Sequence, residues 1–186
     1  MSGDVTGTES DDEVGMESIE GEASARLLPQ DALLRSVVEP VGSATAERSL
    51  GDDVVRIDRS DLAAVAESAK SAGFNMCVDV TAVDYKGVRR TRFEVVVNLL
   101  SHQHNRRLRI VTAVPEDDPT VPSLVSVYPG TNFFEREVYD MFGINFEGHP
   151  DLTRILMPDD WDGYPLRKDF SVGEVPVQFK ESHQVQ

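Results

Sequence analysis

The sequence predicts a two-layer α+β domain, with a mainly antiparallel or mixed sheet and helices, followed by an extended and irregular C-terminal tail. Three strand-like segments, at residues 76–83, 92–100 and 107–114, follow one another through short turns, which is typical of an antiparallel meander. Two segments with apolar residues at helical spacing, at residues 61–72 and 132–142, would cover the sheet. Beyond the second helix, repeated prolines and glycines predict neither a long helix nor a clear strand.

The first part of the chain is expected to form a disordered acidic arm, residues 1–25. It carries eight carboxylates and no base, so it lacks the apolar surface that would offset the entropy of ordering. A solvated arm is the simpler interpretation, and contact with a basic partner or mimicry of a nucleic acid is the alternative. Residues 26–51 should hold a short helix at 31–38, ended by Pro40, and then a flexible linker at 42–50.

The compact domain is predicted to span residues 52–145 and to begin with a short strand at 54–57. A helix follows, capped by Ser60 or Asp61 and ended by Gly73. Its apolar residues recur at i, i+3, i+4 and i+7, which places one face against the sheet. These residues are Leu62, Val65, Ala66 and Ala69.

The clearest strand, residues 92–100, alternates apolar side chains that would face the core. Residues 101–105 form a hairpin loop, and the chain returns as the strand at 107–114. An acidic loop at 115–122 then separates this sheet from the second half, where residues 122–128 are expected to make a short helical turn.

The second long helix is expected to start at Asn132, with Glu135 in the position of a capping box. Arg136 and Asp140, four residues apart on the polar side, would pair weakly. Gly143 suits a left-handed stop. The apolar face of this helix consists of Phe134, Val138, Met141 and Phe142.

Residues 135–170 read EREVYDMFGINFEGHPDLTRILMPDDWDGYPLRKDF and resemble the signature of the 30-kilodalton subunit family of respiratory complex I. This family is the C subunit of the proton-pumping NADH:quinone oxidoreductases. A weaker likeness extends upstream through Asp84-Tyr85 to Pro122-Ser123, and Thr153 is a departure, since the family usually has a base there. The matching residues are Glu135, Arg136, Glu137, Tyr139, Asp140, Phe142, Gly143, Gly148, His149, Pro150, Asp151, Leu152, Arg154, Pro165, Leu166, Arg167, Lys168 and Asp169.

The resemblance implies a structural subunit of the peripheral arm that carries no cofactor and whose tail embraces the D subunit, the large quinone-module subunit. Neighbouring subunits would pass electrons from NADH through FMN and iron–sulfur clusters to quinone, and the complex would pump protons. The expected location is the cytoplasmic side of the cell membrane, attached through the complex. An equivalent subunit of a relative with another electron donor, such as a membrane-bound hydrogenase or a deazaflavin-dependent dehydrogenase, is the alternative.

Composition excludes several other classes of protein. With 33 acidic and 18 basic side chains the formal charge is −15, which disfavours nucleic-acid binding and adhesion to anionic lipid. Cys77 is the single cysteine, so the chain cannot form an internal disulfide or ligate an iron–sulfur cluster through its own cysteines alone. It shows no dinucleotide fingerprint, P-loop or nucleophile elbow, and no apolar run of membrane-spanning length or signal peptide, which predicts a prokaryotic cytoplasmic chain.

The carboxylates of the second helix do not predict an active site. Glu135 and Glu137 are two residues apart and therefore point about 200° apart around the helix, so they cannot share a substrate. Glu137 and Asp140 can lie together, and with Arg136 they predict a structural charge network. We therefore expect no catalytic, cofactor-binding or metal-binding residue in this chain.

His149 and Asp151 are the one pair that favours a different hypothesis, an independent metal-dependent enzyme. However, His149 stands between Gly148 and Pro150, which is typical of a turn held by hydrogen bonds. The simpler prediction is a structural histidine.

The tail, residues 146–186, is too apolar to remain free and is predicted to dock on a partner. A chain cut after Gly148 would then still fold. Trp161, Leu166 and Phe170 are the candidate anchors. Basic side chains would fix the register against acidic groups of the partner, namely Arg154, Arg167 and Lys168.

Overall fold

The computed structural model describes residues 31–41, 44–49 and 51–171. The expected acidic arm, residues 1–25, and the end of the chain after residue 171 lie outside the described residues. In the described part, the helices and strands are α1 (Ala32–Val38), β1 (Thr45–Ser49), β2 (Asp52–Ile57), the 3₁₀ turn η1 (Arg59–Asp61), α2 (Leu62–Ser71), β3 (Met76–Asp84), β4 (Phe93–Ser101), β5 (Arg106–Val114), β6 (Thr120–Pro122), α3 (Thr131–Phe142) and β7 (Asn145–Glu147).

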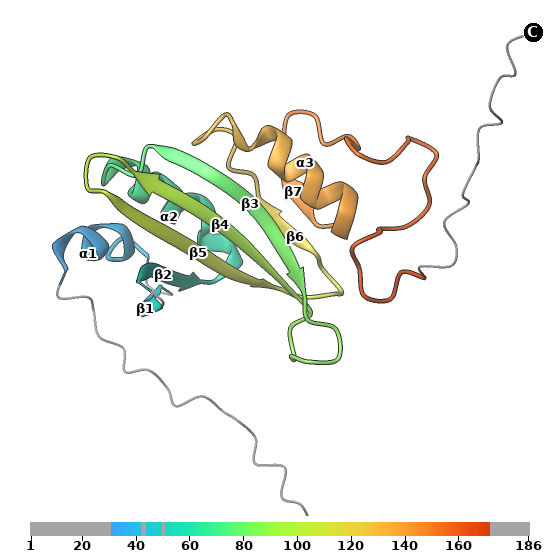
Figure 1. Ribbon diagram of the computed structural model, residues 1–186, viewed down its shortest axis with the longest axis horizontal. Helices are drawn as coiled ribbons and strands as arrows, with labels where there is room; N and C mark the ends of the chain where they lie inside the picture. The colour runs from blue at the N-terminus through green and yellow to red at the C-terminus, as the bar shows by residue number, and fades with distance from the viewer. Residues whose placement is uncertain (1–30, 42–43, 50, 172–186) are drawn as a thin grey trace, which may run out of the picture.

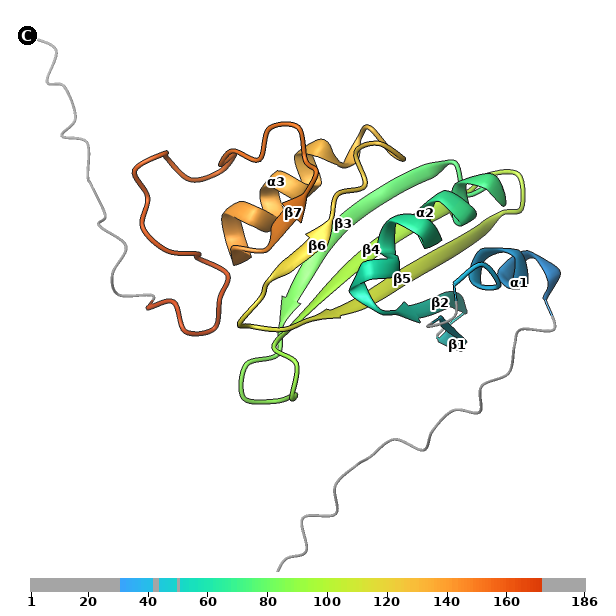
Figure 2. The same ribbon diagram turned by 180° about the vertical axis from the view of Figure 1, so that it is seen from behind.

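The main sheet has five strands in the order β1-β2-β5-β4-β3 (Figure 1). β3, β4 and β5 form the antiparallel meander that the short turns predict, and β2 adds to β5 in parallel. After β2 the chain crosses over the sheet through α2 to reach β3 at the opposite edge (Figure 2). The predicted α+β class with a mixed sheet is therefore confirmed.

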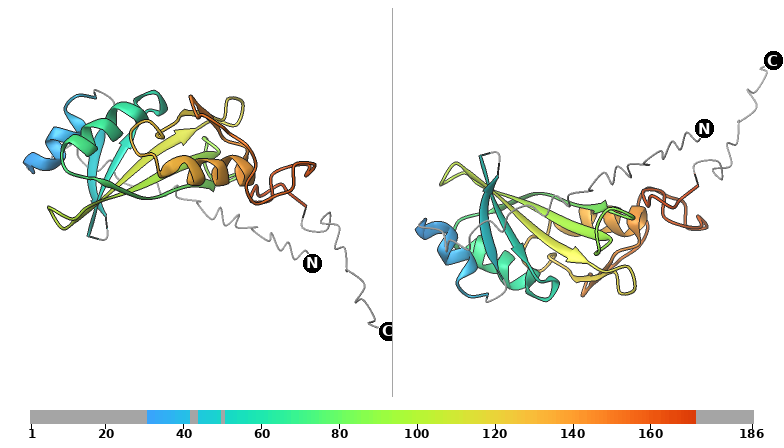
Figure 3. Two further views of the ribbon diagram at one scale, coloured as in Figure 1. Left: turned by 90° about the horizontal axis from the view of Figure 1, so that it is seen from above. Right: turned by 90° about the horizontal axis from the view of Figure 1, so that it is seen from below.

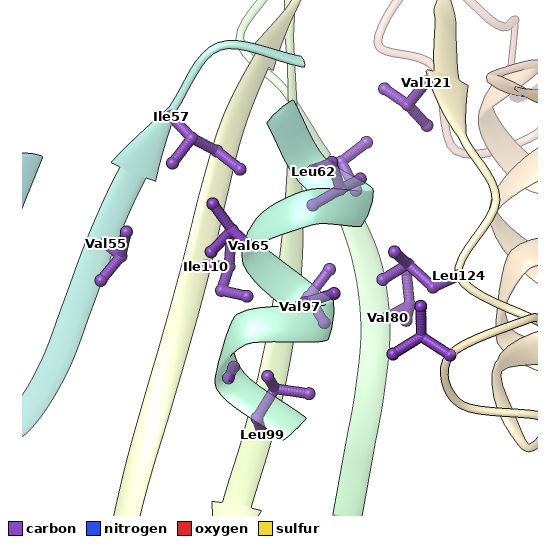
Figure 4. Packing of buried hydrophobic residues seen from close by; sticks show 14 of the residues in the cluster. Val55, Ile57, Leu62, Val65, Val80, Val97, Leu99, Ile110, Val121 and Leu124 are labelled. Carbon is purple, nitrogen blue, oxygen red and sulfur yellow. The ribbon is translucent and has the colours of Figure 1, made fainter. Parts of the chain in front are cut away.

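The core lies between α2 and the sheet. In β4, every second residue from Phe93 to Leu99 is buried, as its alternating sequence predicts. Leu62 and Val65 of α2 lie over Val97 and Ile110 of the sheet (Figure 4). All four residues of the predicted apolar face of α2 are buried, so the helical spacing correctly identified the packing surface.

The expected linker at residues 42–50 contains a strand instead. Thr45–Ser49 forms β1, which pairs antiparallel with β2 at the edge of the sheet. Its sequence lacks large apolar residues, so no periodicity reveals it. Backbone pairing and the contact of Glu47 with Arg56, 3.2 Å apart, support the strand.

Two further short strands correct the prediction for the second half of the chain. β6 lies in the expected acidic loop, and β7 follows Gly143, where no clear strand was expected; the two pair in parallel. β7 buries Phe146, which therefore belongs to the core of its own chain and not to a partner's surface. Three-residue strands carry too little periodicity to be recognised locally.

α3 begins at Thr131, with Gly130 at the cap position, so the expected cap at Asn132 is wrong. Glu135 is fully buried and does not form the capping box. Its carboxylate accepts hydrogen bonds from the Ser123 hydroxyl at 2.6 Å, the Leu124 amide at 2.8 Å and the Thr131 hydroxyl at 2.7 Å. The carboxylate thus joins α3 to the segment before it, because these donors satisfy it better than the helix's own amides.

Candidate docking surface

The C-terminal strap, residues 148–171, continues from β7 and lies near α3 at one end of the molecule, opposite α1 (Figure 3). It contains no helix or strand, as its prolines and glycines predict. The strap is nevertheless fixed to the rest of the chain at two places, and each is centred on a buried charged side chain.

The first attachment is Asp140 of α3, whose side chain is fully buried. Its Oδ2 accepts the backbone N–H groups of Ile155, Leu156 and Met157 at 3.0, 2.7 and 2.9 Å. Its Oδ1 accepts a hydrogen bond from Arg154 Nη1 at 2.7 Å. Burial alone would raise the pKa of Asp140, but these backbone and guanidinium donors together lower it below its ordinary value.

This arrangement shows that the expected weak pair of Arg136 and Asp140 is wrong. Asp140 points into the molecule, whereas Arg136 donates to the carbonyl oxygens of Thr153 and Arg154, both at 3.1 Å. Helical spacing places the two residues one turn apart, but the strap supplies each with better partners. Glu137 remains exposed.

Arg154 also closes a loop within the strap. Its Nη2 donates to the carbonyl oxygen of Gly163 at 3.3 Å, and its guanidinium lies 5.5 Å from the centre of the Tyr164 ring. The two ends of residues 155–162 are thereby held together. The arginine predicted to fix the register against a partner is thus engaged by its own chain.

The second attachment is Arg92, which is buried just before β4. It contacts Asp84 through two hydrogen bonds, at 3.1 and 2.9 Å, and Asp169 of the strap at 2.5 Å. Glu116 is a third carboxylate partner. Lys86 binds Asp169 as well, at 2.6 Å. Hydrogen bonds from Arg92 and Lys86 lower the pKa of Asp169 below its ordinary range.

Backbone and aromatic contacts complete this attachment. The Lys168 amide donates to Asp84 at 2.9 Å, and the Leu166 amide donates to the Met141 carbonyl oxygen at 3.1 Å. Arg167 Nε donates to the carbonyl oxygen of Phe142, the last residue of α3, at 2.5 Å, and the Arg167 guanidinium lies over the Tyr164 ring. A chain cut after Gly148 would lose all of these contacts, which argues against the expectation that it remains a stable domain.

Gly143 explains how the strap approaches α3 so closely. It ends the helix in the predicted left-handed conformation, with a φ of 70°. A Cβ atom at this position would lie 2.5 Å from the Tyr164 ring and 2.7 Å from Arg167. The glycine is therefore required both by the backbone turn and by the contact with the strap.

The strap leaves several apolar side chains exposed. Leu166, one of the predicted anchors, is 54% exposed, and Leu156 and Ile155 are 56% and 38% exposed. The other two predicted anchors, Trp161 and Phe170, are half-buried and stack on each other with their ring centroids 6.3 Å apart. Composition alone did not show that Ile155 and Leu156 are exposed while neighbouring apolar residues are covered. Their exposure follows from the direction of their amides, which point toward Asp140.

His149 has the structural role that its turn predicts. Its Nδ1 accepts the amide of Asp151 at 3.0 Å, and its Nε2 lies 3.2 Å from the carbonyl oxygen of Asn132. Within the described residues, no group of three or more histidine, cysteine, aspartate or glutamate side chains is placed to hold a metal ion. Cys77 is half-buried, and this burial raises the pKa of its thiol to about 12.

The attachments predict how stability depends on pH. Burial would raise the pKa of Asp84, but hydrogen bonds from Arg92 and from the amides of Lys168 and Lys86 lower it from 3.8 to about 2. Such a carboxylate contributes stability above its unfolded pKa, and the contribution is lost as the pH falls through the folded pKa. We expect the free energy of unfolding to fall between about pH 4 and pH 2, with roughly 2 kcal/mol from this group.

Urea denaturation at each pH measures this loss. Asp84→Asn, which cannot titrate, should show a shallower decline over the same range than the unmodified chain. Equal slopes for the two chains would contradict the assignment of this titration to Asp84.

None of the helices in the described ranges is long and apolar enough to cross a membrane.

Comparison with known proteins identifies the family. A family model described as the 30 Kd subunit of the respiratory-chain NADH dehydrogenase matches residues 55–176. The C subunit of the NADH-quinone oxidoreductase from a Nocardioides species is 42% identical over 166 residues, which cover 82% of this chain and 66% of that protein. The protein of the same name from Saccharopolyspora erythraea is 46% identical over 145 residues, which cover 76% of this chain and 57% of that protein. This chain thus spans less than two thirds of the length of these two relatives.

Two solved structures are also similar. A trypsin-resistant fragment of Nqo5 is 37% identical with a TM-score of 0.55, over 59% of this chain and 89% of the fragment. A chain of the membrane-bound sulfane sulfur reductase, an archaeal respiratory membrane complex, has a TM-score of 0.68 over 83% of this chain and 96% of that chain. Its 22% identity shows a common fold alone. The family match and the identity to the two bacterial relatives show that this chain belongs to the 30-kilodalton subunit family of the respiratory-chain NADH dehydrogenase.

Proposed function

We propose that this chain is a structural subunit, without a cofactor of its own, in the peripheral arm of a proton-translocating NADH:quinone oxidoreductase. It docks onto the D subunit, which is the large quinone-module subunit, and its C-terminal strap provides the docking surface. FMN, the iron–sulfur clusters and the quinone belong to other subunits of the complex. The chain is attached to the cytoplasmic side of the membrane through these subunits.

The strap is the observation that supports this proposal. An irregular segment lacks the regular backbone hydrogen bonds that hold a helix or a strand. This one is instead held in place by the buried side chains of Asp140 and Arg92. It is also the place where large apolar side chains, Ile155, Leu156 and Leu166, are exposed. A rigid and partly apolar surface favours association, because little conformational entropy is lost on binding.

The charged groups of the family signature support a structural role. Glu135 and Asp140 are fully buried and receive hydrogen bonds from the chain itself. Asp84 and Arg92 satisfy each other in the same way. These groups hold elements together, and Arg92, which also lines a shallow surface pocket beside Glu116 and Asp117, is bound there by carboxylates of its own chain.

The test is purification of the tagged full chain from solubilised membranes, followed by purification of the same chain alone. We expect the large quinone-module subunit in the first preparation in an amount equal to the tagged chain. The isolated chain should show no flavin or iron–sulfur absorbance, since these groups are assigned to other subunits. Flavin or iron in stoichiometric amount, or a complex that lacks the large quinone-module subunit, would contradict the proposal.

A further inference from the structure

We propose that residues 155–162, here called the docking loop, form a preshaped projection that inserts Ile155 and Leu156 into an apolar pocket with a basic rim on the partner subunit. This inference rests on the proposed function, because it names the part of the strap that binds and the chemistry of the surface that receives it. Three observations carry it: the fixed ends of the loop, its exposed apolar side chains and its uncompensated charge.

The docking loop is held in shape from inside the molecule. Arg154 links its start to Gly163 at 3.3 Å, and Asp140 binds three consecutive amides at its beginning, with distances between 2.7 and 3.0 Å. The anchoring carboxylate is fully buried. A loop closed by such contacts has already lost the conformational freedom that binding would otherwise remove.

The same contacts determine which side chains face outward. The amides of Ile155, Leu156 and Met157 all point toward Asp140. Met157 packs against the core, whereas Ile155 and Leu156 are left 38% and 56% exposed. Folding alone gives no reason to place two adjacent branched aliphatic residues on a surface in this way. Burial in a partner's pocket would remove this apolar area from water.

The charge of the docking loop indicates the chemistry around that pocket. The loop contains Asp159, Asp160 and Asp162 and no base. All three carboxylates are exposed, and no ion pair joins them to another described residue. Lysine or arginine side chains on the partner would complement them. An anionic lipid surface would repel them, so the favoured partner is a protein.

The decisive experiment measures binding of the full chain to the large quinone-module subunit for two matched sets of variants. Leu156→Ser and Ile155→Ser keep the backbone amides that Asp140 binds. Phe133→Ser and Val88→Ser are controls that remove exposed apolar side chains elsewhere, which are 61% and 70% exposed. We expect the two loop variants to bind at least tenfold more weakly and the two controls to bind within twofold of the unmodified chain. Thermal unfolding should show the same midpoint for all five proteins.

A third set tests the basic rim. Replacing Asp159, Asp160 and Asp162 together by asparagine should slow association and reduce its dependence on salt, because the long-range attraction is lost. Unchanged salt dependence would overturn the assignment of a basic rim.

The outcomes separate this inference from the proposed function. If the unmodified chain binds the large quinone-module subunit and Leu156→Ser binds equally well, the docking loop is not the anchor, although the proposed function stands. If the unmodified chain fails to bind that subunit, the proposed function fails and this inference fails with it. Equal weakening by the loop variants and the controls would also overturn the inference, because exposed apolar area anywhere would then suffice.

Discussion

Replacing Asp140 by alanine is expected to lower the free energy of unfolding by about 3 to 5 kcal/mol, as measured when one partner of a buried ion pair is removed. The variant leaves Arg154 without its carboxylate and three amides of the strap without their acceptor. Small domains are stable by only about 5 to 15 kcal/mol, so a large fraction of the molecules would unfold or would release the strap. No other single carboxylate of the described part holds so many strap amides.

Two spectroscopic signals separate these two results. Trp161 is the single tryptophan and lies in the strap, so its fluorescence reports on release of the strap, whereas far-ultraviolet circular dichroism reports on the sheet and helices. Urea denaturation followed by both signals gives the loss of stability. Asp140→Asn keeps one carbonyl acceptor, so its free energy of unfolding should fall less than that of Asp140→Ala. A loss below about 1 kcal/mol for Asp140→Ala would contradict the role assigned to this carboxylate.

Replacing Arg92 by methionine is expected to have an effect of similar size, about 3 to 5 kcal/mol. Methionine preserves much of the volume but leaves Asp84 buried without its two guanidinium hydrogen bonds. It also removes one of the two cations that hold Asp169. The pKa of Asp84 should rise in this variant, since burial then acts without its main opposing hydrogen bond.

The double variant Arg92→Met with Asp84→Asn is the internal control. It removes both charges of the buried pair, so it should be more stable than Arg92→Met alone. The difference between the double variant and the sum of the single variants gives the coupling energy. If the double variant were no more stable than Arg92→Met, Arg92 would act mainly through its contacts with Glu116 and Asp169 and not through its pairing with Asp84.

Those parts of the fold that rest on local periodicity were predictable. The alternation in β4 and the spacing of Leu62, Val65 and Ala69 in α2 each identify a buried face from neighbouring residues alone. β1, β6 and β7 were not predictable in this way, since they are short and partly polar. Their partner strands stabilise them, and pairing with a distant strand leaves no local pattern.

The docking role of the tail stays a prediction, whereas the internal arrangement of the strap could not be predicted from the sequence. The apolar content of the tail and its resemblance to a known family both indicated a docking segment. Helical spacing, however, paired Asp140 with Arg136, whereas the structure pairs it with Arg154 and the strap. The roles of Trp161 and Phe170 as anchors stay predictions, because their mutual stacking describes the chain by itself.

The contact of Arg92 with Asp169 has a consequence for the timing of synthesis. The two residues are 77 positions apart in the chain. At a translation rate of about 5 to 20 residues per second, Asp169 is added roughly 4 to 15 seconds after Arg92. Every strand of the main sheet is translated before then, so the sheet can form while the nascent chain still lacks its strap. The docking loop can close only after Gly163 has been added, so the surface proposed to bind a partner is completed later than the sheet.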